Sequence, residues 1–212
     1  MAMKIKVYGL TLSNNALRAI AVLNEKELEY ELCPVDLQSG AHKKPEFLAL
    51  NPFGQIPVVQ DGDDIIFESR AITRYIATKY KESGADLLPV SSAKLETWLQ
   101  VESSQFYPAI SGINFELLIK PMLGMTTDMS NVEKHAEKFS AVLDVYEAHL
   151  AKNKYVAGDV FTLADLNHMP EIYLLLKSPK AELITSRPHV KAWWEDISAR
   201  PAWKKTAALF PA

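Results

Sequence analysis

The hydrophobic pattern changes character near residue 81, and this change constrains the fold more than any other feature of the chain. Before it, alternating apolar residues typical of strands interchange with the three-to-four-residue spacing typical of helices. Beyond residue 91 the pattern is helical, and the polar, turn-rich stretch 82–90 separates the two regions. The sequence therefore predicts an α/β domain over residues 1–81, a linker over 82–90 and an all-α domain over 91–212.

The α/β part begins with a strand, a helix and a second strand. Ile5 and Val7 alternate with polar residues and predict the first strand. Residues 16–23 have helical spacing, and Tyr30 and Leu32 alternate again. Two consecutive strands joined by a helix are typical of a parallel pair with a right-handed crossover.

A hairpin and a second helix complete this part. Residues 56–59 and 65–67 flank Asp61-Gly62, a dipeptide favoured in two-residue hairpin turns. Ser69 follows the second of these strands and precedes a run with helical spacing. We therefore expect an antiparallel pair followed by a helix that Ser69 caps.

The composition excludes several classes of protein. The net charge is −3 and both signs are scattered, so the sequence lacks the basic stripe of a nucleic-acid-binding protein. No apolar run approaches the roughly 20 residues of a membrane helix. Cys33 is the single cysteine, which is typical of a reducing compartment, and the histidines lack metal-ligand spacing. We expect a cytosolic protein with no metal and no nucleic-acid or membrane partner.

The run 51–57 is the most informative motif. Pro52 and Pro57 bracket Gly54 and lead directly into a strand, so the backbone there is constrained. With a cis bond before Pro57, the backbone N–H and C=O of Ile56 would be free to pair with an extended peptide. A trans proline in a loop is the commoner alternative.

Two points where a strand turns into a helix offer further candidates. Ser69 begins the helix after the hairpin, where amides and a hydroxyl suit a carboxylate, and Glu68 beside it could hold an ammonium group. Ser13 lies at the first such turn, where a hydroxyl and a helix N-terminus could favour the thiolate of a bound thiol. His42 and Lys43 lie in an expected loop and could meet a carboxylate. Plain N-caps and solvated surface charges are the alternatives, and the local pattern alone favours them.

Together these residues resemble the glutathione transferases, and specifically the plant phi class. The resemblance extends along nearly the whole chain. Its most specific segments are 42–47, 51–57, 61–62 and 67–72, followed by 98–102, 124–128, 143–147, 158–166 and 198–201.

The resemblance implies a thioredoxin-like N-terminal domain with a cis bond before Pro57, followed by an all-helical C-terminal domain. It implies that Ser13 is the catalytic residue and donates a hydrogen bond to the glutathione thiolate. The implied glutathione contacts are Gln55 and Ile56 with the peptide backbone, Glu68 and Ser69 with the γ-glutamyl group, and His42 and Lys43 with the glycyl carboxylate.

The resemblance also implies a second substrate and a partner subunit. The expected electrophile pocket lies between the domains, with walls from Leu12, Leu37, Tyr107, Phe115, Ile119 and Met122. Many phi-class members have an acidic residue where Tyr107 stands, so the substrate preference is left open. Phe53 resembles the aromatic key that family members insert into a partner, which implies a homodimer.

The expected function is conjugation of the glutathione thiolate to hydrophobic electrophiles, as in detoxification. Glutathione is then a co-substrate, and no metal is needed. A serine-type site is also compatible with glutathione-dependent peroxidase activity. The alternative is a non-catalytic carrier of apolar metabolites or hormones.

Overall fold

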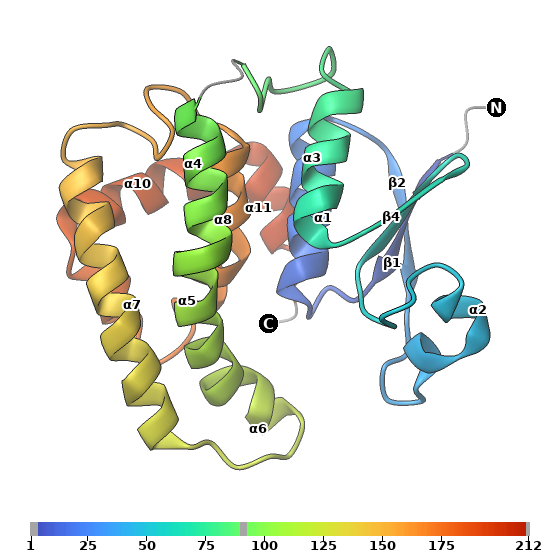
Figure 1. Ribbon diagram of the computed structural model, residues 1–212, viewed down its shortest axis with the longest axis horizontal. Coiled ribbons are helices and arrows are strands. Elements are labelled where there is room, and N and C mark those ends of the chain that lie inside the picture. Colours follow the sequence, from blue (N-terminus) through green and yellow to red (C-terminus); the bar gives the residue numbers. More distant parts are fainter. Residues whose placement is uncertain (1–3, 90–92, 211–212) are drawn as a thin grey trace. The chain divides into compact units, whose positions relative to one another are not determined.

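The computed structural model describes residues 4–89 and 93–210 (Figure 1). The chain forms two compact units. One contains the described residues up to Leu88 together with those from Arg200 onward, and the other contains Pro89–Ala199. The sequence pattern assigns residues 200–212 to the helical domain, whereas in the structure the described residues from Arg200 onward belong to the first unit.

The first unit is built on a four-stranded sheet with the order β2-β1-β3-β4. β1 (Ile5–Gly9) and β2 (Tyr30–Pro34) are parallel, with Ile5 opposite Tyr30. β3 (Val58–Asp61) runs antiparallel to both β1 and β4 (Asp64–Phe67). The predicted parallel pair and hairpin are therefore confirmed.

Helices cover both faces of this sheet. α1 (Asn14–Glu25) and α3 (Ser69–Lys79) lie side by side on one face, as Figure 1 shows. Their apolar stripes supply the buried residues Leu17, Ile20 and Ile72. On the other face, Val58 packs with Phe47 of α2 (Pro45–Leu48), which follows the short 3₁₀ turn η1 (Ala41–Lys43).

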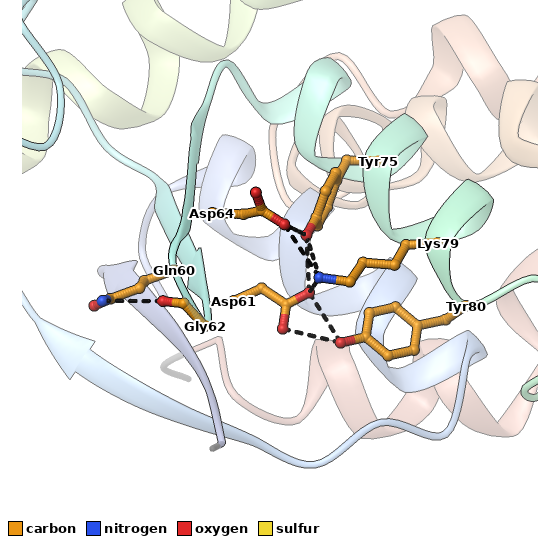
Figure 2. A network of polar contacts seen from close by, with 7 residues as sticks. All are labelled: Gln60, Asp61, Gly62, Asp64, Tyr75, Lys79 and Tyr80. Carbon is orange, nitrogen blue, oxygen red and sulfur yellow. Dashed lines mark hydrogen bonds and ion pairs between the residues drawn. The ribbon is translucent and has the colours of Figure 1, made fainter. Parts of the chain in front are cut away.

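A polar network joins the hairpin to the end of α3 (Figure 2). Tyr75 donates to the carboxylates of Asp61 (3.0 Å) and Asp64 (2.6 Å), and Tyr80 donates to both oxygens of Asp61 at 2.9 Å. The Lys79 ammonium lies 2.8 Å from Asp61 and 3.2 Å from Asp64. The network fixes the β3–β4 turn against the helix that carries Ser69.

The C-terminal helix α11 (Pro201–Ala207) packs on α1 within the first unit. Arg200 forms a two-pronged ion pair with the buried Glu25, with N–O distances of 2.6 and 2.7 Å. Asn24 donates to Thr206 at 2.8 Å. These contacts explain why the described residues from Arg200 onward are part of the first unit.

The second unit is helical. Its elements are α4 (Ala93–Val101), the π-helical turn η2 (Glu102–Phe106), α5 (Tyr107–Asn114), a second π-helical turn η3 (Phe115–Ile119), α6 (Lys120–Met122), α7 (Met129–Leu150), α8 (Leu163–Leu175), α9 (Glu182–Thr185) and α10 (Pro188–Ser198). Phe106, Phe139, Tyr146, His168 and Trp193 form an aromatic cluster in its core. Among the described residues, no helix combines the length and apolarity needed to cross a bilayer.

Candidate active site

The segments predicted to form the site leave the sheet at one end. Tyr8 in β1 pairs with Val58 in β3, and Val58 pairs with Phe67 in β4. One residue after Tyr8 the chain leaves β1 toward Ser13, Pro57 immediately precedes β3, and β4 leads directly into α3. The strand register therefore brings three segments together that are far apart in the sequence.

Ser13 is the N-cap of α1. Its backbone is extended (φ −90°, ψ 117°), and its Oγ accepts a hydrogen bond from the Ala16 N–H at 3.3 Å. This bond occupies a lone pair of the oxygen and leaves the hydroxyl hydrogen available, because the described residues offer it no acceptor. The same residue can thus cap the helix and donate to a ligand, so the two interpretations of Ser13 are compatible.

A buried polar cluster connects the starts of the two helices. Arg18 is fully buried in α1 and donates to Asn15 Oδ1 at 2.6 Å and to Ser69 Oγ at 2.8 Å. The Ser69 hydroxyl in turn donates to Asn15 Oδ1 at 3.3 Å. Neither Asn15 nor Arg18 is among the site residues predicted from the sequence. The available signal was a charged residue at position 18 within an otherwise apolar helical stripe.

Glu68, and not Ser69, is the N-cap of α3. Glu68 has a φ of 65° and a ψ of 110°, whereas Ser69 is the first helical residue, so the prediction that Ser69 caps this helix was wrong. A positive φ in a residue with a side chain costs of order 1–3 kcal/mol and is concentrated at functional sites. The Glu68 side chain is exposed next to the buried Ser69.

Asn51 organises the proline-rich loop. Its buried side chain accepts from the Phe53 N–H at 3.0 Å and donates to the Gln55 carbonyl at 2.8 Å. The Ile56–Pro57 bond is cis, as the resemblance implies. Within the part of the chain that the structure describes, the backbone of Ile56 has no hydrogen-bond partner, so it is available to an extended peptide.

The turn that contains His42 and Lys43 packs on this loop. Lys43 Nζ donates to the carbonyls of Phe53 (3.0 Å) and Gly54 (2.9 Å), which leaves one of its three hydrogens for another acceptor. Gly54 has a φ of 57°, and a Cβ there would lie 2.6 Å from the His42 carbonyl oxygen. His42 Nδ1 is buried, and no partner for it lies among the described residues.

The residues predicted to meet the electrophile occur in both units. In the first unit, Leu12 and Leu37 are exposed apolar residues that flank the site segments. In the second unit, Tyr107 begins α5, Phe115 and Ile119 bound η3, and Met122 ends α6. Phe115 is 43% exposed and Met122 is 55% exposed, so both side chains are accessible from solvent.

Two family models match the chain. The N-terminal domain of glutathione S-transferase matches residues 3–78, and its C-terminal domain matches residues 106–201. The chain belongs to the glutathione S-transferase family. Among curated relatives, glutathione S-transferase 3 of Zea mays is 58% identical over 98% of this chain and 95% of its own length. Glutathione S-transferase F13 of Arabidopsis thaliana is 46% identical over 97% of this chain and 95% of its own length.

Solved structures agree with this family assignment. Glutathione S-transferase III in its apo form has a TM-score of 0.95 and 59% identity, and the match covers 99% of this chain and 98% of that one. Glutathione S-transferase I of maize, in complex with an atrazine glutathione conjugate, has a TM-score of 0.92 and 44% identity over 98% of each chain. The predicted thioredoxin-like domain followed by a helical domain is confirmed, as is the resemblance to the plant phi class.

The relatives also decide between the two functions considered from sequence. The curated relatives at high identity are glutathione S-transferases, and a related structure holds a glutathione conjugate. The protein is therefore a glutathione transferase enzyme, and the alternative of a non-catalytic carrier is not supported.

Proposed function

We propose that Ser13 activates glutathione by donating its free hydroxyl hydrogen to the thiolate sulfur. The observation that carries this proposal is the geometry of the cap: Ser13 Oγ accepts from the Ala16 N–H, which leaves its own hydroxyl hydrogen available to a ligand. A free thiol has a pKa of about 8.5, so only a few per cent is thiolate at neutral pH. A hydrogen bond and the N-terminus of a 12-residue helix both favour the charged form and lower that pKa.

The other predicted contacts supply one group for each polar part of glutathione. The unpaired backbone of Ile56, next to Gln55, suits the cysteinyl N–H and C=O as an added strand. Ser69 at the start of α3 suits the γ-glutamyl carboxylate, and the exposed Glu68 suits the ammonium group. His42 and Lys43 are assigned to the glycyl carboxylate. Two carboxylates and one ammonium group thus each receive a partner of complementary charge or polarity.

The second substrate is proposed to be an apolar electrophile. Leu12, Leu37, Tyr107, Phe115, Ile119 and Met122 are assigned to its binding walls. The maize relative bound to an atrazine glutathione conjugate supports an aryl halide as a suitable test electrophile. We further propose a cytosolic homodimer that detoxifies such compounds, with Phe53 as the aromatic key.

The experiment compares Ser13→Ala with the parent enzyme and with Ser198→Ala, which removes a serine hydroxyl from the second unit whose hydrogen bond to the Glu195 carbonyl is exposed to solvent. The ultraviolet absorbance of bound thiolate is followed against pH, together with the rate of conjugation to an aryl halide. We expect the pKa of the bound thiol to rise and kcat/KM to fall roughly 10- to 100-fold in Ser13→Ala only. Peroxidase activity with an organic hydroperoxide is measured on the same three proteins.

Glutathione affinity provides the check on folding. It should change little in Ser13→Ala, because the contacts at Gln55, Glu68 and Lys43 remain. An unchanged thiol titration together with an unchanged rate would assign the activating hydrogen bond to another residue and refute the role of Ser13.

A further inference from the structure

A buried carboxylate holds together the segment that carries much of the exposed apolar surface of the second unit. Glu116 lies in η3, and its side chain is 3% exposed. Phe115, Met122, Leu123, Met125 and Met129 surround it in the sequence, and all five are exposed. These residues lie in the range 115–129, which is called the 115–129 segment below.

The Glu116 carboxylate accepts three hydrogen bonds and forms an ion pair with Lys120. Lys120 Nζ contacts its two oxygens at 2.8 and 2.7 Å, Asn131 Nδ2 donates to Oε1 at 2.7 Å, and the Asp128 N–H donates to Oε2 at 2.9 Å. The backbone carbonyl of Glu116 also accepts from Thr127 Oγ1 at 2.9 Å. One residue therefore connects η3 to α6, to the connection before α7 and to the first turn of α7.

The charge of Glu116 is well stabilised. The hydrogen bonds from Lys120, Asn131 and the Asp128 N–H lower its pKa to about 2, so the carboxylate is ionised throughout the physiological range. Lys120 also lies 5.9 Å from the centre of the Phe115 ring, so the same ion pair that fixes the backbone contacts an aromatic residue of the proposed wall.

The exposed methionine side chains of the 115–129 segment can adapt to different ligands. Methionine is unbranched and flexible, and a surface rich in methionine accommodates ligands of different shapes. A wall of this kind has a defined form only if its backbone is fixed. A five-residue π-helical turn, which re-aims side chains and occurs often at functional sites, begins the segment.

We propose that Glu116 is a positioning residue that fixes the 115–129 segment and thereby determines which electrophiles the enzyme accepts. This inference rests on the proposed assignment of Phe115, Ile119 and Met122 to the electrophile wall. Glu116 itself does not touch the reacting atoms. Its effect therefore belongs in the discrimination between electrophiles and not in the activation of glutathione.

The main variant is Glu116→Gln, which keeps the shape of the side chain and removes its charge. Glu195→Gln is the matched control, because Glu195 also pairs with a lysine four residues away, but at 3.7 Å and on the exposed surface. KM and kcat are measured for glutathione, for a small aryl halide and for a bulky aralkyl isothiocyanate. Hydrogen exchange is followed over residues 120–131 and over α10.

For Glu116→Gln we expect the KM of the bulky electrophile to change at least threefold relative to that of the small one. The KM of glutathione and the thiol titration should stay at the parent values, and exchange should accelerate in residues 120–131 but not in α10. Lys120→Met should change the selectivity in the same way as Glu116→Gln. Lys120→Arg, which keeps the positive charge, should retain the selectivity of the parent enzyme. Glu195→Gln should change none of these quantities.

Two results would overturn the proposal. One is an unchanged ratio of electrophile KM values despite faster exchange in residues 120–131, and the other is an equal change for all substrates, which would indicate general destabilisation. If Glu116→Gln fails to fold, Asn131→Ala removes one partner of the carboxylate and is judged by the same criteria.

Met122→Ala separates this inference from the proposed function. If it alters the KM ratio while Glu116→Gln does not, the wall stands and the role of Glu116 is refuted. If neither variant alters the ratio, the assignment of the wall is wrong, and the inference fails with it.

Discussion

At the scale of single residues, the site depends on polar groups that are hydrogen-bonded to a predicted ligand contact, Ser69. Asn15 Oδ1 accepts from both Arg18 and Ser69, so it fixes the direction of the Ser69 hydroxyl. We expect Asn15→Ala to lower the free energy of unfolding by about 1–3 kcal/mol, because a buried guanidinium and a buried hydroxyl each lose an acceptor. The KM of glutathione should rise severalfold while kcat changes little.

Asn14→Ala is the control for this prediction. The neighbouring Asn14 has a buried Oδ1 without a partner among the described residues, so its removal should cost much less. Urea unfolding and glutathione titration of both variants test the comparison. Equal effects of the two substitutions would show that the Asn15 cluster has no special role in orienting Ser69.

The site residues that could be predicted from the sequence lie at local boundaries, whereas those that could not depend on long-range contacts. Ser13 and Ser69 lie at strand-to-helix boundaries, which the hydrophobic pattern locates. Arg18 is important because it lies 2.8 Å from a residue 51 positions away, and no local pattern encodes that distance. The helical stripe fixes the face on which Arg18 lies, but not its partner on the neighbouring helix.

At the scale of elements, the network in Figure 2 makes the attachment of the hairpin to α3 dependent on pH. Burial alone would raise the pKa of Asp61, but hydrogen bonds from Lys79, Tyr80 and Tyr75 outweigh it and lower the pKa below its ordinary value. A depressed pKa contributes stability that is fully present above the unfolded-state pKa, about 3.9, and is lost as the pH falls through the folded-state value.

We therefore expect Asp61→Asn to be destabilised by about 1–3 kcal/mol at pH 7. The difference from the parent enzyme should shrink as the pH falls below about 4, because the parent loses the same charge. Thermal unfolding of both proteins across this pH range is the measurement. Asp63→Asn, an exposed change in the same turn, should behave like the parent. A destabilisation of Asp61→Asn that does not vary with pH would rule out the ionic contribution.

At the scale of the whole molecule, the unit to which α11 belongs could not be predicted from the sequence. The helix at residues 201–207 is encoded locally by its apolar spacing and by Pro201 at its first position. Its packing on α1 depends on Arg200 meeting Glu25, a pair separated by 175 residues. The sequence pattern assigns residues 200–212 to the helical domain, because it does not show the long-range ion pair and packing that determine the unit.

The exposed ring of Phe53 leads us to predict the oligomeric state. Phe53 is 65% exposed, and its ring meets Phe67 edge-on at a centroid distance of 6.1 Å. Its N–H is held by Asn51, so the exposed ring is mounted on an ordered loop. A rigid, exposed aromatic residue is typical of an anchor that fills a pocket in a partner.

In a two-fold dimer the same contact occurs twice, so one substitution removes two anchors. With a cost of about 2 kcal/mol for each anchor, Phe53→Ser should raise the dimer dissociation constant roughly 1000-fold. Sedimentation velocity over a range of concentrations measures this change. Val160→Ser, which replaces another exposed apolar residue in the second unit, should leave the dimer intact. Phe53 can act as an anchor of a homodimer only if it binds in a pocket of a second copy of the chain. A parent enzyme that sediments as a monomer at micromolar concentration would therefore exclude the homodimer.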